Sequence, residues 1–170
     1  MRGPFCLICG HNMKSSSVYQ VISILLTFIF AFLVAANFGT YHKPEEANLM
    51  KKQLLSELEK KSGELNSTDP GLEFFRSFQS SIELSLTPQN YKMHSLYRII
   101  GCFISLLGIV MLRRKKALGL HLVIAGIIFV VFTGFYVFGF TLIGWVFNIL
   151  YILFGGLVSL YYYSKRELYA

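Results

Sequence analysis

The chain has 170 residues, of which 54% are hydrophobic, and its mean hydropathy is +0.54. Soluble domains are less apolar and space their apolar residues periodically, so this composition indicates an integral membrane protein. The formal net charge of +7 does not indicate nucleic-acid binding, because the excess lies in the tails and in one short connection. Between Lys43 and Arg98, basic and acidic residues are equal in number.

A cysteine pair in the predicted cytoplasmic tail, residues 1–17, is the one recognisable chemical motif. Cys6, Cys9 and His11 resemble half of a zinc ribbon, because two thiolates at this spacing can hold one tetrahedral ion. A structural zinc site uses four ligands and no fourth is nearby, so we expect neither a metal site nor another cofactor within this chain. The three residues stay candidates only for a site shared with a partner chain or a second copy.

The first apolar run, residues 18–38, is long enough for one membrane crossing of about 20 residues. The alternative is a signal peptide that starts at Met13 rather than Met1 and is cleaved after Ala36, where small residues lie. We favour an uncleaved helix, because the run is longer than the roughly 7–15 residues of a signal core.

Residues 39–95 form a loop that we expect to be helical in two pieces. Pro44 suits a first helical position and Gly63 a helix end, and Asp69-Pro70 marks a second start. Apolar residues recur at near-helical spacing in both pieces: Ala47, Met50, Leu54, Leu58 and Leu65, then Leu72, Phe75, Phe78, Ile82 and Leu86, before Pro88 closes the stripe. We expect these stripes to pack against each other or against the ends of the membrane helices. Lying in the membrane interface and docking a partner protein are the alternatives.

The second apolar run, residues 96–112, carries small residues on one face. Gly101, Ser105 and Gly108 recur at helical spacing, which favours close contact with another helix. Arg98 lies near the start of the run, and we expect its side chain to reach the lipid head groups. An ion pair with a loop acid such as Glu83 is the alternative.

The stretch from Ala117 to Ser164 contains no Lys, Arg, Asp or Glu. It is too long for one membrane crossing and close to the length of two, so it predicts helices at residues 118–136 and 142–162. Gly139 lies between them and can supply the positive φ of a tight turn.

The last apolar run is predicted to present a small and polar face. Asn148 lies well inside the run, where an unpaired amide is costly, and small residues recur near it at close to helical spacing. We expect this face to make helix contacts through Gly144, Asn148, Gly155 and Ser159. His121, near the start of the preceding run, is expected to lie at the membrane interface.

Basic residues at the ends of the apolar runs predict the orientation. They form a connection at residues 113–117 and part of a tail at residues 163–170, through Arg113, Arg114, Lys115 and Lys116, then Lys165 and Arg166. Positive charges are retained in the cytoplasm, so both chain ends are expected there and the large loop outside. The predicted fold class is an all-α integral membrane protein with four transmembrane helices and a helical outer loop between the first two.

No group of residues in the sequence indicates a reaction. The apolar runs contain no Asp or Glu, which argues against an enzyme and against ion-coupled transport. By elimination we expect a non-catalytic accessory or scaffold subunit of a membrane complex. Its partners would be the lipid bilayer and other membrane subunits or copies of itself, not nucleic acid. A small oligomeric transporter or channel component is the alternative, and a membrane enzyme is less favoured. The Phe/Tyr-rich and Lys/Ser-rich composition favours the cytoplasmic (inner) membrane of a bacterium.

Overall fold

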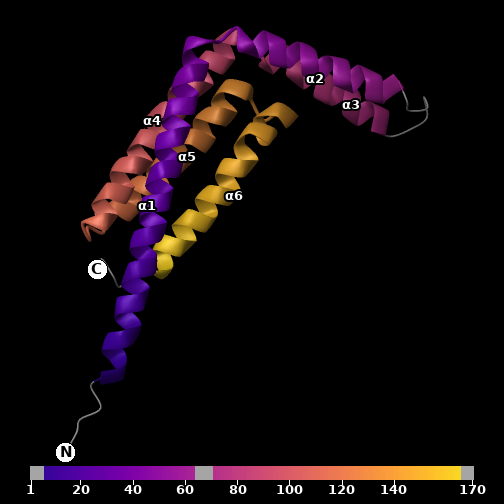
Figure 1. Cartoon of the computed structure of the whole chain (residues 1–170). Coiled ribbons are helices and arrows are strands. Elements are labelled where there is room, and N and C mark those ends of the chain that lie inside the picture. Colours follow the sequence, from indigo (N-terminus) through magenta and orange to yellow (C-terminus); the bar gives the residue numbers. More distant parts are fainter. Residues whose placement is uncertain (1–5, 64–70, 166–170) are drawn as a thin grey trace, which may run out of the picture.

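The computed structural model describes the backbone of residues 6–63 and 71–165, with side chains from residue 18 onward in those ranges. The described residues form helices only, and four of the six are long and apolar enough to cross a membrane. The chain is therefore an all-helical, multi-pass integral membrane protein (Figure 1). The helices are α1 (Cys6–His42), α2 (Glu46–Gly63), α3 (Gly71–Ser85), α4 (Pro88–Arg113), α5 (Leu118–Phe138) and α6 (Leu142–Ser164).

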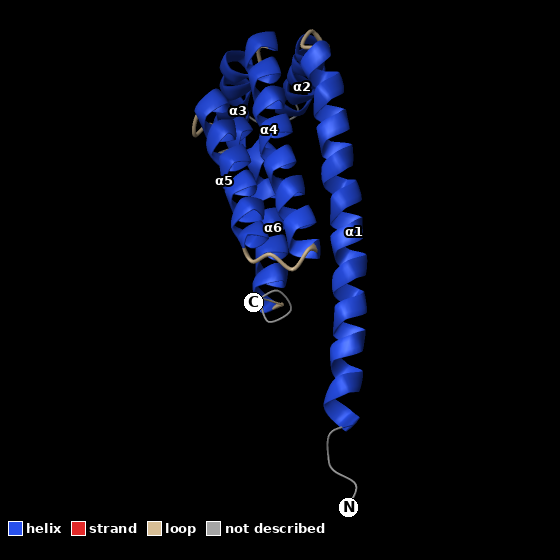
Figure 2. Ribbon diagram, turned by 90° about the vertical axis from the view of Figure 1, so that its left-hand side faces the viewer, coloured by secondary structure: helices blue, strands red, loops and turns tan. Residues whose placement is uncertain are grey.

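The four spanning helices form an elongated bundle, and α2 and α3 form a paired arm that projects from one end of it (Figure 1). We call this end the arm end. It also holds the start of α4 and the turn between α5 and α6. The opposite end holds the α4–α5 connection and the end of α6, and α1 extends past it (Figure 2). Because Arg113, Arg114, Lys115 and Lys116 lie in that connection, we call it the basic end.

Two of the spanning helices begin earlier than the apolar runs indicate. α1 is helical from Cys6 rather than from residue 18, and α4 begins at Pro88 rather than at residue 96. The stripe ends before Pro88, as expected, because α3 ends at Ser85, and the proline also suits the first turn of α4. Thr87 caps α4, and its side chain accepts a hydrogen bond from the backbone N–H of Asn90 at 3.2 Å.

The α5–α6 turn confirms the conformation predicted for Gly139. Its φ is +70°, in the region that glycine enters without steric cost. Thr141 then caps α6: its hydroxyl oxygen accepts from the N–H of Gly144 at 3.2 Å, while its O–H donates to the carbonyl of Phe138 at 2.9 Å. The short turn makes α5 and α6 antiparallel neighbours.

Direct backbone contact joins α4 to α5. A Cβ atom added to Gly108 would lie 2.7 Å from the carbonyl oxygen of Gly119, and one added to Gly119 would lie 2.7 Å from the backbone nitrogen of Leu112. Glycines at these positions let the helices approach more closely than any side chain would allow. Between them, the hydroxyl of Ser105 donates to the carbonyl of Val123 at 3.4 Å.

Three helices meet through tyrosines near the basic end. The Tyr19 hydroxyl of α1 donates to the carbonyl of Leu112 in α4 at 3.1 Å. The Tyr162 hydroxyl of α6 donates to the hydroxyl of Ser23 in α1 at 3.0 Å. The two tyrosine rings lie edge to face with centroids 5.7 Å apart. These contacts hold α1 against both α4 and α6 at this level.

The arm packs on the arm end of the bundle through an apolar core of its own. Ile82 of α3 and Leu86, which directly follows α3, are fully buried beside Phe138 and Ile143, which flank the α5–α6 turn. Side chains of both predicted stripes lie against this core, including Met50, Leu54, Leu58 and Phe78. The expectation that the stripes pack against each other and the helix ends is thus confirmed for the described residues; Leu65 and Asp69-Pro70 lie outside them.

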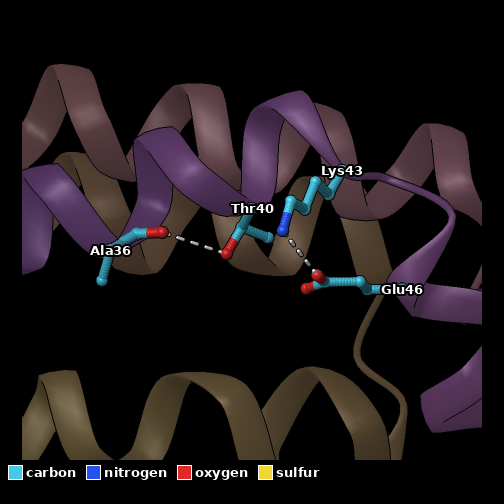
Figure 3. A network of polar contacts seen from close by, with 4 residues as sticks. All are labelled: Ala36, Thr40, Lys43 and Glu46. Carbon is cyan, nitrogen blue, oxygen red and sulfur yellow. Dashed lines mark hydrogen bonds and ion pairs between the residues drawn. The ribbon is translucent and has the colours of Figure 1, made fainter.

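A tight corner joins α1 to α2. The Thr40 hydroxyl donates to the carbonyl of Ala36 at 3.1 Å, and the Lys43 ammonium lies 3.8 Å from the Glu46 carboxylate (Figure 3). Both charged side chains are exposed, so this ion pair contributes at most about 1 kcal/mol. The direction of the arm therefore depends on its apolar core rather than on this corner.

The glycine contact between α4 and α5 makes a testable prediction. We expect Gly108→Ala to lower the free energy of unfolding by roughly 1–2 kcal/mol, because the new methyl group meets backbone atoms that cannot move aside. Gly39→Ala is the matched control, since nothing lies within 4 Å of an added Cβ there; it should be neutral or stabilising by up to about 1 kcal/mol. Unfolding in mixed micelles, followed by circular dichroism, measures both. Equal stability of the two variants would contradict the contact.

Candidate functional site

A cluster of polar side chains lies inside the bundle, toward its arm end. His94, Arg98 and Cys102 are spaced four residues apart and so share one face of α4. The Arg98 guanidinium reaches α6, where Nη2 donates to the carbonyl of Phe147 at 3.1 Å. Its central carbon lies 4.6 Å from the ring centroid of Tyr151 and 5.8 Å from that of Phe147. The arginine therefore joins α4 to α6 through a carbonyl and two ring faces.

No acidic side chain neutralises Arg98 among the described residues. The four spans contain no Asp or Glu, and the nearest predicted partner, Glu83, is engaged elsewhere. The Glu83 carbonyl accepts from the Lys51 ammonium at 2.6 Å, and its carboxylate accepts from the Gln79 amide at 3.4 Å. The Nε atom of Arg98 is buried without a hydrogen-bond partner. The side chain thus points into the bundle against α6, instead of outward to the membrane surface or to Glu83.

His94 is a deeply buried titratable side chain of the cluster. It is 1% exposed, and neither ring nitrogen has a hydrogen-bond partner among the described residues. Phe138 and Phe147 surround it edge-on, with ring centroids 4.7 and 5.6 Å from that of the imidazole. Burying polar atoms without partners costs on the order of 1–3 kcal/mol, so His94 lowers the free energy of unfolding of the chain.

Tyr151 connects the cluster to α1. Its side chain lies close to those of Cys102 and Asn37. Asn37 is 7% exposed, and its amide nitrogen donates to the carbonyl of Leu33 at 2.6 Å. Cys102 is 1% exposed, so its thiol is inaccessible from the membrane. The polar cluster, defined here as Asn37, His94, Arg98, Cys102 and Tyr151, therefore draws on three helices.

Two apolar grooves open on the outside of the bundle. The smaller one, the α1–α6 groove, has a volume of about 220 Å³ and is lined by Ile29, Leu33, Leu150, Tyr151 and Phe154. The larger one, the α5–α6 groove, has a volume of about 470 Å³, and its walls include Ile128, Phe132, Ile152, Gly156 and Ser159. Tyr151 belongs both to the polar cluster and to the smaller groove.

The small-residue faces predicted on the second and fourth spans both turn toward α5. Gly101 and Gly108 face α5 backbone, and Ser105 bonds to it. Gly155 lies against Ile127 of α5, and Gly144 lies against Gly139 of the turn. Ser159 lines the α5–α6 groove instead.

Asn148 has no exposed surface and lies against Gly134 of α5. Its amide nitrogen donates to the carbonyl of Gly144 at 2.9 Å, while its side-chain oxygen has no partner among the described residues. The Asn148 side chain is therefore packed in the contact between α6 and α5, away from both grooves.

Metal ligands do not gather in the part of the chain that the structure describes, where no group of three or more His, Cys, Asp or Glu side chains could hold an ion. The side chains of Cys6, Cys9 and His11 lie outside the described residues, as does Arg166. His121 is exposed near the basic end. The chemistry that the described polar cluster can offer is recognition of an acidic oxygen by Arg98.

The sequence patterns did not identify this cluster. The position of Arg98 near the start of an apolar run instead predicts contact with the lipid head groups. The four-residue spacing of His94, Arg98 and Cys102 was the available signal, because it places three reactive side chains on one helix face. Comparison of the chain with models of known protein families, with curated proteins and with solved structures finds no match.

The unpartnered nitrogens of His94 make a second prediction. We expect His94→Leu to leave the free energy of unfolding in detergent unchanged or raise it, because an apolar side chain removes a buried polar group that has no partner. Tyr162→Phe is the comparison, since it removes a buried hydroxyl that is hydrogen-bonded to Ser23; we expect a loss of about 0.5–1.5 kcal/mol. Thermal unfolding of purified variants measures both. A larger loss for His94→Leu than for Tyr162→Phe would show that the imidazole is satisfied in the folded protein.

Proposed function

We propose that this protein is a non-catalytic accessory or scaffold subunit, and that its α5–α6 groove binds a transmembrane helix of another subunit or of a second copy. One observation carries the proposal: an apolar groove of about 470 Å³ runs along the contact of two spanning helices and is left unfilled by the chain itself. Its α5 wall extends from Ile124 to Phe135, which is about 16 Å along a helix axis. That length suits several turns of a helix.

Small residues on the α6 wall of this groove support the same role. Gly155, Gly156 and Ser159 line it, and nothing lies within 4 Å of a Cβ added to Gly156. Small side chains let a neighbouring helix approach closely, and close packing is the main source of helix association in lipid. Large apolar side chains beside the groove, such as Ile128 and Phe132, are 61% and 70% exposed. The partner would be another subunit or a second copy of this chain.

A small oligomeric transporter or channel component is the alternative, and the charged residue inside the bundle favours it. Intramembrane ionisable groups often mark solute pathways. However, both grooves are lined almost entirely by apolar side chains, and Asn148 lies away from them. A polar path would need side chains from other copies, so we prefer the accessory role.

We also propose an orientation, with the basic end in the cytoplasm and the arm outside, in the cytoplasmic membrane of a bacterium. Basic residues are enriched in cytoplasmic connections, and the α4–α5 connection carries four consecutive ones. The arm has no comparable excess of positive charge between Lys43 and Arg98. The proposed outer position of the arm therefore follows from charge.

Cysteine labelling tests the orientation. In a background with Cys6 and Cys9 changed to Ser, a membrane-impermeant maleimide should label Ser80→Cys on the exposed side of α3 in intact cells. Lys116→Cys, which is exposed at the basic end, should react only after the membrane is permeabilised. Cys102 is 1% exposed and can stay in both variants. The reverse labelling pattern would overturn the proposed orientation.

Filling the α5–α6 groove tests the accessory role. The wild type, extracted in mild detergent, should carry a stoichiometric second polypeptide or second copy in native mass spectrometry. Gly156→Leu should lose it while keeping its thermal stability, because the new side chain enters open space. Gly39→Leu is the control on α1, where the space is equally open, and should retain the partner. A wild type that is monomeric in every detergent, or a Gly156→Leu variant that retains the partner, would reject the proposal.

A further inference from the structure

We propose that the α1–α6 groove binds one acyl chain of an anionic lipid whose acidic head group pairs with Arg98. This binding site is independent of the partner helix proposed for the α5–α6 groove. It rests on two features that meet at Tyr151: an unneutralised guanidinium and an apolar groove.

The charge of Arg98 calls for an anion. Among the described residues only Nη2 of the guanidinium donates a hydrogen bond, to the carbonyl of Phe147, and Nε is buried without a partner. The ring faces of Tyr151 and Phe147 attract a cation but do not neutralise it. A guanidinium presents several N–H groups in one plane, an arrangement that matches the oxygens of a phosphate or a carboxylate. The spans themselves offer no carboxylate.

A second side chain with unpartnered polar atoms lies one helical turn from Arg98 toward the arm end. His94 occupies the same face of α4, is 1% exposed, and has two ring nitrogens that bond to nothing among the described residues. Buried polar groups are normally satisfied, so two neighbouring exceptions indicate a group that the chain alone does not provide. Oxygens of a lipid head group, directly or through water, would satisfy both side chains.

The groove lies on the correct side of Arg98 for an acyl chain. Along α6 its wall runs from Leu150 and Tyr151 to Phe154, and along α1 from Leu33 to Ile29, in both cases away from the arm end. Figure 1 shows α1 and α6 diverging toward the arm. A lipid of the arm-end leaflet would thus place its head at Arg98 and its chain toward the membrane centre.

The size of the groove distinguishes a lipid chain from other occupants. Its α1 wall extends from Ile29 to Leu33, about 6 Å along the axis, which is one helical turn and too short to seat a helix. A volume of about 220 Å³ with apolar walls suits part of one hydrocarbon chain. A free inorganic anion could pair with Arg98 but would leave these walls unused.

Lipid retention tests the proposal on the full chain. The protein is reconstituted in phosphatidylcholine bilayers containing a small fraction of phosphatidic acid, released into mild detergent, and examined by native mass spectrometry. We expect bound phosphatidic acid in preference to phosphatidylcholine. Arg98→Gln should reduce its retention by about tenfold, the loss expected for hydrogen bonds to a charged group. Arg114→Gln, an exposed charge at the basic end, should have no effect.

A second pair of variants tests the groove without removing the charge. Leu33→Trp fills the groove and should reduce retention, whereas Leu25→Trp, on a side chain of α1 that is 57% exposed, should not. Equal retention of phosphatidic acid by wild type and Arg98→Gln would overturn the proposal, as would equal retention by wild type and Leu33→Trp. So would competition by inorganic phosphate as effective as that by phosphatidic acid, or an acidic segment of a second polypeptide found cross-linked at position 33 in place of lipid.

Discussion

Direct backbone packing on α5 is the constraint on which the rest of the bundle depends. Between helices in lipid there is no water to expel, so their association relies on close packing and hydrogen bonds. Glycines provide that packing on two sides of α5: Gly119 meets α4, and Gly134 receives Asn148 of α6. α5 therefore lies between α4 and α6, and α1 packs on the far side of α4. In this order the first and last spans meet through side chains: Tyr162 contacts Ser23 near the basic end, and Phe30 contacts Phe154 farther along. An apolar groove is left between the two helices closer to the arm.

The arm depends on the same arrangement. Ile82 and Leu86 have no exposed surface because Phe138 and Ile143 cover them, and these two residues flank the turn that Gly139 makes possible. A hydrogen bond from the Ser85 hydroxyl to the carbonyl of Phe138, 3.3 Å long, adds a polar link at this point. The arm is thus an extension of the bundle core. Its direction is set by the short α5–α6 connection more than by the exposed ion pair at the α1–α2 corner.

Features that depend on local chemistry were predictable from the sequence. Long apolar runs indicate spans because a helix must cover the hydrocarbon thickness, and Gly139 indicates a turn because it accepts a positive φ. The start of α4 was missed because Pro88 suits both a helix start and a helix stop; Thr87, which caps the helix, is the residue that distinguishes them. The direction of Arg98 could not be predicted in this way. It depends on the rotation of α6, which places Phe147 and Tyr151 opposite α4, and that rotation is set by packing against α5.

Because the spans contain no acidic residue, the energetics of Arg98 depend on what can approach it from the groove. Removing an ion from water costs several kcal/mol even after relaxation, whereas a cation–π contact returns about 0.5–2 kcal/mol and a hydrogen bond to a charged group about 1.5–3 kcal/mol. The contacts of the guanidinium with one carbonyl and two rings therefore offset its desolvation cost at best. The unpartnered Nε of Arg98 and the ring nitrogens of His94 add to that cost. A carboxylate in a neighbouring span would have neutralised the charge within the chain, and the spans contain none. The charge is then most stable when an anion from outside the chain approaches it. In a membrane the abundant anions are lipid head groups, and the apolar groove beside Tyr151 offers a place for the chain that such a head group carries.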